Sequence, residues 1–300
     1  MSGTQVPAVE AFHHTLTGAF AYLAYDPATR QAVVVDPVLD FDRRSGAVTT
    51  AAADQLVARI RELQLQVVWI LETHAHADHL SAAAYMKDAL GCQVATGAGV
   101  CAVQATAVRM FDLEPRFPTD GSQFDRLWND GDQFRLGDIA CSVIATPGHT
   151  PDSVTYLIGD CAFVGDTLFL PYLGTARCDF PGASARALYD SIRKLYTLPD
   201  ATRVMVGHDY PTAPAAAAYC SDLGSEKQAN VHLSASTTRE DFVAFREQRD
   251  STLVLPELFF FALQINVRAG RFPAPAANGT RQLHVPVHLP QNWTVQPSRR

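Results

Sequence analysis

Residues 67–71 read Val-Val-Trp-Ile-Leu, and residues 74–79 read His-Ala-His-Ala-Asp-His. The first run is apolar and predicts a buried strand, and the second places three imidazoles and a carboxylate directly after it. Neutral imidazole and carboxylate are strong ligands for divalent transition-metal ions. Because a turn that leaves a strand lets several donors converge without deforming regular structure, this stretch predicts a metal site at a strand end.

Ligand-type residues also follow three later apolar runs. Pro-Gly and Gly-Asp pairs between these runs are typical of turns and hairpins. The run 141–145 leads to His149, a hairpin over 153–164 leads to Asp166, and the run 203–206 leads to His208. Four strand ends therefore present candidate ligands, and this combination is far more specific than one local motif. A turn residue is the simpler interpretation of His149 or Asp166 alone, but the agreement among all four strand ends disfavours it.

Composition excludes several classes of protein. A chain of 300 residues that is 47% hydrophobic can bury a large core. Its net charge of −7 provides no basic stripe for nucleic acid. The apolar segment 253–267 is too short to span a bilayer, and no targeting segment is visible, so no membrane anchor is expected. Six cysteines without a Cys-x-x-Cys pair fit a reducing compartment, and we expect a cytoplasmic protein.

Strands and helices alternate along the chain. We expect an opening hairpin of strands 20–26 and 32–36. Three helices are expected to begin at the N-caps Asp54, Ser184 and Thr237. A further helix is expected over 80–90, directly after the His-rich motif. Two sheets packed face to face and covered by helices would bring every candidate ligand to one edge. The predicted fold is an α/β four-layer αββα sandwich. We expect one domain over 1–300, with a core of about 10–250 and a C-terminal extension, 251–300, packing on it.

Four motifs together resemble the metallo-β-lactamase superfamily: residues 73–79, 147–150, 165–167 and 207–210. Within that superfamily, the loop 174–180 (Gly-Thr-Ala-Arg-Cys-Asp-Phe), the segment 207–210 and the late segment 264–270 resemble the persulfide dioxygenases, also called sulfur dioxygenases. The resemblance covers roughly residues 10–290. It implies the αββα fold and a metal-dependent enzyme.

The donor set leaves two metal arrangements open. In the zinc hydrolases of this superfamily, His74, His76 and His149 would hold one ion, with Asp78, His79 and His208 holding a second and Asp166 bridging. All of these donors are present, so a ligand count does not exclude a dinuclear zinc enzyme. The resemblance to persulfide dioxygenases instead implies one Fe(II) per chain, held by the two-His-one-carboxylate set of His74, His149 and Asp166.

The same resemblance implies the reaction and the remaining roles. Glutathione persulfide would be oxidised by O2 and water to sulfite and glutathione, a step of sulfide oxidation. His76, Asp78, His79 and His208 would orient the ligands and hold water, although Asp78 could be only a helix N-cap. Arg177 and Tyr210 would contact the substrate and assist catalysis, and Arg268 would add a substrate contact. Cys178 is expected to be an inert thiol.

Two other classes of function remain open. The first is a dinuclear zinc thioester hydrolase resembling glyoxalase II, which shares this scaffold but typically carries clustered basic residues in its C-terminal region, where this chain is rich in proline. The second is a non-catalytic scaffold, which would be expected to lack ligands. An exposed patch over 259–261 would indicate a homodimer, although we expect those phenylalanines to pack in the core.

Overall fold

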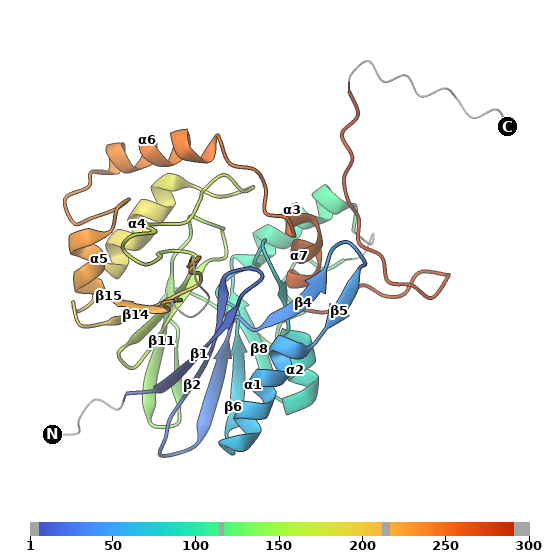
Figure 1. Cartoon of the computed structure of the whole chain (residues 1–300), viewed down its shortest axis with the longest axis horizontal. Helices are drawn as coiled ribbons and strands as arrows, with labels where there is room; N and C mark the ends of the chain where they lie inside the picture. The colour runs from blue at the N-terminus through green and yellow to red at the C-terminus, as the bar shows by residue number, and fades with distance from the viewer. Residues whose placement is uncertain (1–5, 114–116, 212–216, 291–300) are drawn as a thin grey trace.

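Two six-stranded mixed sheets form the centre of the molecule (Figure 1). In this computed structural model, residues 6–113, 117–211 and 217–290 are described. The first sheet has the order β1-β2-β3-β6-β8-β9 and contains β1 (Ala8–His14), β2 (Ala19–Tyr25), β3 (Gln31–Val35), β6 (Gln66–Leu71), β8 (Gln93–Gly97) and β9 (Arg126–Trp128). The second has the order β10-β11-β12-β13-β14-β15 and contains β10 (Gln133–Leu136), β11 (Ile139–Ala145), β12 (Val154–Ile158), β13 (Cys161–Gly165), β14 (Arg203–Val206) and β15 (Cys220–Asp222).

A small third sheet has the order β5-β4-β7 and contains β4 (Val38–Asp42), β5 (Ala47–Thr49) and β7 (Leu80–Ser81). The sequence analysis did not predict these strands. The hairpin of β4 and β5 ends just before the first helix of the chain, and β7 pairs with β4 through Ser81 and Leu80. The residues immediately after the His-rich motif therefore join a sheet, and this sheet borders the metal-ligand loop.

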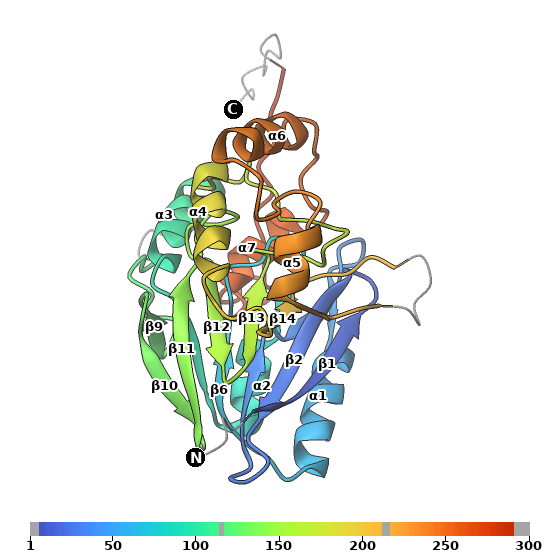
Figure 2. The ribbon, with the colours of Figure 1, turned by 90° about the vertical axis from the view of Figure 1, so that its left-hand side faces the viewer.

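Helices cover the outer faces of both large sheets, as Figures 1 and 2 show. On the first sheet, α1 (Ala51–Glu62) and α2 (Ala83–Leu90) pack onto β2, β3 and β6. On the second, α4 (Ala185–Leu195) packs onto β13 and β14, with α6 (Arg239–Asp250) against α4. The other helices are α3 (Val100–Phe111), α5 (Leu223–Ala229) and α7 (Phe259–Asn266). The predicted four-layer αββα sandwich is confirmed.

The space between the two sheets is filled by large apolar side chains. Tyr22, Val33 and Val35 from the first sheet meet Val143, Tyr156 and Phe163 from the second. This pattern follows from alternation, because successive residues of a strand point to opposite faces of its sheet. In β13, Phe163 faces the other sheet while Ala162 and Val164 face the helices.

Most predicted element positions agree with the structure, with small corrections at helix starts. The opening hairpin forms as β2 and β3, Ser184 caps α4, and Gly91 ends α2 in the left-handed conformation. The N-cap of α1 is Thr50 rather than Asp54, which lies in the first turn and accepts a hydrogen bond from the Thr50 hydroxyl.

Two further helix starts were also predicted wrongly. Helix α2 begins at Ala83 rather than at residue 80, because Leu80 and Ser81 pair with β4. The N-cap of α6 is Thr238 rather than Thr237. Thr237 instead accepts a hydrogen bond from the Ser234 N–H and is not available as a cap.

The late segment contributes to the core through α7. Ala262 and Ile265 join the cluster beneath the first sheet, and Phe259 and Leu263 pack with Phe111 of α3. Core packing of Phe259 is thus confirmed. The homodimer stays a prediction. The division into a core over 10–250 and a C-terminal extension over 251–300 also stays a prediction. Among the described residues, none of the helices combines the length and apolar character that a bilayer crossing requires.

Replacing Phe163 with Ala tests the contact between the sheets. Phe163 is only 1% exposed, and removing its ring should lower the free energy of unfolding by about 3–5 kcal/mol through lost burial and a cavity. Urea unfolding followed by circular dichroism measures the change. Leu16→Ala is the control, because Leu16 is 83% exposed and its truncation should cost less than about 0.5 kcal/mol. Equal losses in both variants would contradict the described packing.

Candidate metal centre

The loops that follow four strands meet at one edge of the sandwich. His74 lies after β6, His149 after β11, Asp166 after β13 and His208 after β14. One ligand atom each from His74, His149 and Asp166 can be chosen so that all three atoms lie within 4.8 Å of one another. The structure thus brings together, at one site, residues that the sequence separates by up to 92 positions (166 minus 74).

The spacing of these three donors suits a single ion. The Oδ2 atom of Asp166 lies 3.9 Å from His74 Nε2 and 3.7 Å from His149 Nε2. Two ligands at about 2.0–2.2 Å from an ion can be up to roughly 4 Å apart, so both distances are compatible with a shared cation. All three side chains are buried, and His74 Nε2 has no hydrogen-bond partner. A buried polar atom without a partner is costly, and a cation would satisfy it.

Hydrogen bonds select the ring nitrogen that His74 and His149 turn toward this site. His149 Nδ1 lies 2.8 Å from the carbonyl oxygen of Arg177, so it donates and leaves the Nε2 lone pair free. The Thr73 hydroxyl donates to Asp36 Oδ2 at 2.8 Å, so its oxygen accepts from His74 Nδ1 at 3.0 Å. Burial lowers the pKa of His74 well below its ordinary value, which favours the neutral, ligating form.

His76 has a different environment from His74. Its Nε2 lies 3.1 Å from Asp36 Oδ1 and 3.6 Å from Glu72 Oε2, and all three side chains are buried. Burial raises the pKa of Asp36, and burial together with the Asp36 charge raises the pKa of Glu72 well above its ordinary value. The sequence analysis missed Asp36 and Glu72. Glu72 directly precedes the Thr-His motif, but a single carboxylate between a strand and a motif carries no distinctive spacing.

A second group of donors lies beside the first. His208 Nε2 is 3.4 Å from Asp166 Oδ1 and 3.3 Å from Asp78 Oδ2, and His79 Nδ1 is 3.2 Å from the same Asp78 oxygen. Burial acts to lower the pKa of His208, but the negative charges of Asp166 and Asp78 act to raise it. The pKa of His208 is therefore above its ordinary value. The N-cap alternative for Asp78 is wrong, because α2 begins only at Ala83.

Gly207 is required by the close approach of two strands at this site. A Cβ atom at this position would overlap Oδ1 of Asp166, with the Gly165 carbonyl carbon and oxygen each 3.0 Å away. Any side chain at residue 207 would therefore displace the carboxylate that faces both groups of histidines.

His149 and Asp166 of the three donors line a pocket of about 330 Å³, which we call the metal pocket. Its lining combines apolar side chains with carboxylate, imidazole, guanidinium and phenol groups. The pocket is lined by Ala77, Asp78, His149, Asp166, Phe169, Leu173, Thr175, Ala176, Arg177, Phe180, His208, Tyr210, Arg246, Arg249, Leu253 and Pro256.

The loop 174–180 is fixed to the metal pocket at several points. Arg177 forms a two-pronged ion pair with Asp179, both contacts at 2.6 Å, and its Nη1 donates to the Val254 carbonyl at 2.7 Å. Its backbone carbonyl accepts the hydrogen bond from His149 Nδ1 and Arg177 lines the metal pocket, while its role in substrate binding and catalysis stays a prediction. Burial raises the pKa of Cys178 to about 12, which agrees with an inert thiol.

A buried ion pair in α6 binds the backbone of this loop. Arg246 pairs with Asp250, and Arg246 Nη1 donates to the Thr175 carbonyl at 3.1 Å. Asp250 Oδ2 accepts from the Cys178 N–H at 2.7 Å. The sequence analysis missed this pair, because Arg and Asp four positions apart on a helix usually mark a solvated face.

Tyr210 and Arg268 lie in different places. The Tyr210 ring stacks on His208 with centroids 5.5 Å apart, lines the metal pocket and is 61% exposed. Arg268 does not line the metal pocket. It lies in a separate cavity with Asp112 and Gln264 and packs over Phe117, so its role in substrate binding stays a prediction.

Asn266 at the end of α7 ties the His-rich motif to the C-terminal segment. Its Nδ2 donates to the carbonyls of His76 and His79, each at 2.8 Å, and its Oδ1 accepts from the Ser81 N–H at 2.8 Å. The backbone of the ligand loop is thus held by a side chain 187 to 190 residues later in the chain.

Comparison with known families matches residues 14–208 to the metallo-β-lactamase superfamily. The chain belongs to this superfamily. It is 47% identical over 289 residues to a probable metallo-hydrolase of Burkholderia pseudomallei, a match that covers 93% of this chain and 98% of the relative. A β-lactamase hydrolase-like protein of Xylella fastidiosa is 48% identical over 284 residues, and this chain spans 65% of its length.

Other members of the superfamily carry more specific names. The chain is 40% identical over 282 residues to glyoxylase B2 of Dictyostelium discoideum, covering 93% of this chain and 97% of that protein. It is 32% identical over 255 residues to the human mitochondrial persulfide dioxygenase ETHE1, covering 84% of each. The crystal structure of ETHE1 from Myxococcus xanthus aligns with a TM-score of 0.70 and 31% identity, covering 88% of this chain and all of that one.

Thr73→Val tests how His74 is oriented. The variant loses the hydroxyl that accepts from His74 Nδ1 and donates to Asp36, so the affinity for a divalent metal should fall by about 10–100-fold. Competition with a chelator measures the affinity, and thermal unfolding of the metal-free protein checks the fold. Thr197→Val, at an exposed threonine after α4, should leave the affinity unchanged. An unchanged affinity in Thr73→Val would show that His74 needs no such support.

Proposed function

We propose that this chain is a persulfide dioxygenase. It oxidises glutathione persulfide with O2 and water to sulfite and glutathione, and it uses one Fe(II) per chain held by His74, His149 and Asp166. The observation that carries this proposal is the cluster of His74, His149 and Asp166, whose donor atoms can be chosen within 4.8 Å of one another.

The ring of His76 lies beside that of His74, with centroids 4.0 Å apart, but its Nε2 faces the carboxylates of Asp36 and Glu72, at 3.1 and 3.6 Å. The remaining donors form a two-His-one-carboxylate set, which is typical of mononuclear iron oxygenases because it leaves coordination positions open. The similarity to the persulfide dioxygenase ETHE1 supports the same interpretation.

The donor set fits this metal. His74 Nε2 is buried without a hydrogen-bond partner, and it lies 3.9 Å from Asp166 Oδ2, the oxygen that also faces His149. Imidazole and carboxylate suit Fe(II), and the site contains no cysteine ligand of the kind that favours zinc. When bound, Fe(II) supplies the redox chemistry that lets electrons pass from the persulfide sulfur to dioxygen.

The surrounding residues bind and orient the substrate. Phe169, Leu173 and Phe180 form the apolar wall of the metal pocket and limit the access of water to the sulfur. Tyr210 at the rim can donate its hydroxyl to the peptide part of glutathione. The backbone carbonyl of Arg177 holds His149. Because the guanidinium of Arg177 is paired with Asp179, a substrate carboxylate that binds this guanidinium must compete with Asp179.

A dinuclear zinc thioester hydrolase is the second candidate. Asp78, Asp166 and His208 offer donor atoms within 4.8 Å of one another, which is a second site next to the first. The 40% identity to glyoxylase B2 also favours this class. In a dinuclear zinc thioester hydrolase, a metal-activated water would attack a thioester carbonyl, and no oxygen would be consumed.

Two ligand variants distinguish one ion from two. Asp166→Ala should lose nearly all bound iron and all turnover, whereas His208→Ala should keep most of its iron, because His208 lies outside the proposed donor set. Elemental analysis of protein purified without air measures iron per chain, and circular dichroism confirms that both variants are folded. Equal loss of metal from both would support the dinuclear alternative.

Oxygen uptake with glutathione persulfide tests the function itself. The anaerobically purified protein should contain about one iron per chain and consume O2 with the release of sulfite. A glutathione thioester serves as the competing substrate. Thioester cleavage by a zinc-loaded protein that takes up no oxygen would replace the proposal with the second candidate.

A further inference from the structure

Three guanidinium groups line the metal pocket, those of Arg177, Arg246 and Arg249. Two of them are already held by carboxylates of the protein. Arg177 pairs with Asp179, and Arg246, which is buried, pairs with Asp250. The positive charges of these two arginines are therefore neutralised within the protein, and a ligand would have to displace a carboxylate to reach either of them.

Arg249 has no such partner. Its side chain is exposed, and within the described part of the chain no hydrogen bond or ion pair involves its guanidinium. Side chains three and four positions apart on a helix meet, and no residue at these distances from Arg249 is acidic. The neighbouring Asp250 pairs with Arg246, and Glu247 lines a different cavity. The sequence of α6 therefore leaves this guanidinium without an internal carboxylate.

The guanidinium of Arg249 lies at the metal pocket rather than away from it. Arg249 is in the last turn of α6, and Leu253, one turn further along the chain, lines the same pocket. Burial, followed by the charges of Arg246 and Arg249, lowers the pKa of His232 to about 4. His232 accepts a hydrogen bond at 2.9 Å from the N–H of Thr175, which is also part of the pocket lining. The charge of Arg249 thus acts on this wall of the pocket.

The other charges of the metal pocket leave that of Arg249 unbalanced. The lining contains two carboxylates, Asp78 and Asp166, and both face His208, at 3.3 and 3.4 Å. A divalent cation at the donor atoms would offset these two charges. The charge that remains in the metal-loaded pocket is then positive and belongs to Arg249, and a guanidinium suits a carboxylate because it can bind both oxygens.

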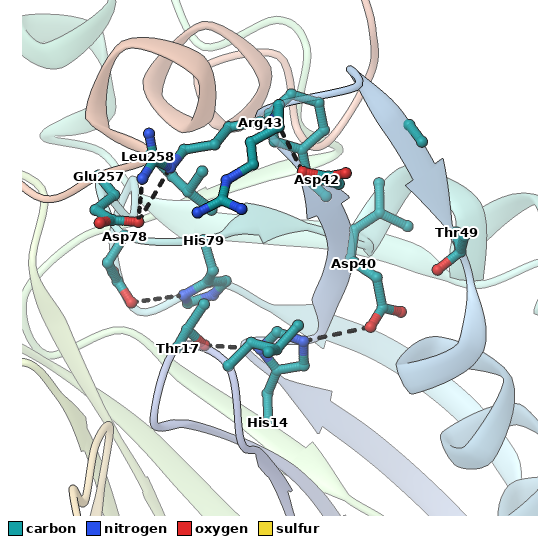
Figure 3. Close-up of a pocket in the computed structure, with 15 residues that line it drawn as sticks. His14, Thr17, Asp40, Asp42, Arg43, Thr49, Asp78, His79, Glu257 and Leu258 are labelled. Carbon is teal, nitrogen blue, oxygen red and sulfur yellow. Dashed lines mark hydrogen bonds and ion pairs between the residues drawn. The ribbon is translucent and has the colours of Figure 1, made fainter.

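The cavity beside the β4–β5 hairpin offers no competing place for a carboxylate (Figure 3). It lies on the other side of the segment after α6, where Arg43 and Glu257 form an ion pair at 3.0 Å. Its lining contains four carboxylates and two guanidiniums, those of Asp40, Asp42, Asp78, Glu257, Arg43 and Arg44. This excess of negative charge repels an anionic group, so the anionic part of a ligand in the metal pocket is favoured on the side of Arg249.

We propose that Arg249 determines the specificity of the metal pocket for a carboxylate-bearing thiol, by pairing with one carboxylate of the glutathione moiety. The identity of this thiol rests on the proposed function. The position of the ion pair rests on the free guanidinium of Arg249, on the carboxylates that already hold Arg177 and Arg246, and on the acidic cavity across the segment after α6.

A purely structural role for Arg249 makes different predictions. A cation in the last turn of a helix interacts favourably with the helix dipole. Such a role would alter the stability of the protein in the same way with or without a ligand. It would not depend on whether the ligand carries a carboxylate, and this difference is the basis of the test.

Three variants of Arg249 test the proposal in the metal-loaded enzyme with glutathione persulfide. The KM should rise about tenfold in Arg249→Ala and further in Arg249→Glu, with kcat changed less than about twofold. Arg249→Lys keeps the charge but not the planar fork, so its KM should lie between those of the wild type and Arg249→Ala. Arg61→Ala, at an exposed arginine of α1, is the matched control and should leave the KM unchanged.

The persulfide of glutathione diethyl ester shows whether the effect depends on the carboxylates. This substrate has none, so its KM should be the same in the wild type and in every variant. Unchanged KM values for glutathione persulfide in Arg249→Ala and Arg249→Glu would overturn the proposal. Equal effects on the diester, or in Arg61→Ala, would also overturn it.

Calorimetry with glutathione itself separates this proposal from the proposed function, because binding requires no turnover. A Kd about tenfold weaker in Arg249→Ala than in the wild type supports the ion pair even if persulfide is not oxidised. Persulfide oxidation together with an unchanged Kd for glutathione supports the function and rejects the role of Arg249.

Discussion

The site depends on the burial of many polar side chains at the edge where four strands end. Desolvation disfavours the charged form of each imidazole and carboxylate, and only the fixed partners around them offset this cost. Thr73 and the Arg177 carbonyl fix the orientation of His74 and His149, and Asp36 and Glu72 engage His76. The acceptors behind the histidines therefore set which ring nitrogen His74 and His149 present at this edge.

This dependence explains how one scaffold can serve different reactions. His74, His149 and Asp166 form one group of donors, and Asp78, Asp166 and His208 form a neighbouring one. Under the proposed function, Asp36 and Glu72 hold the Nε2 of His76, and residues that bind no metal then help to decide how many ions the site takes.

The sequence predicted the layered fold and the candidate ligands because both rest on local patterns. Apolar runs that end at His149, Asp166 and His208 are visible in single segments, and a sandwich is the arrangement that lets them converge. The sequence could not reveal Arg246, Asp250 or Asn266, since their partners lie more than 70 residues away and their spacing resembles that of an ordinary helix. The β4–β5 hairpin was missed because its strands are short, although residues 39–42 of β4 alternate between apolar and acidic side chains as a half-buried strand does.

Asn266 has a consequence for the order in which the protein matures. A ribosome that has synthesised every strand and every candidate metal ligand has still not synthesised the side chain that fastens the loop around His76 and His79. During translation the carbonyls of His76 and His79 lack this partner until α7 emerges and docks, although Asp152 already holds the Ala75 N–H. The assembly of the site is therefore among the latest steps in the biogenesis of the chain, after the sheets that carry it have formed.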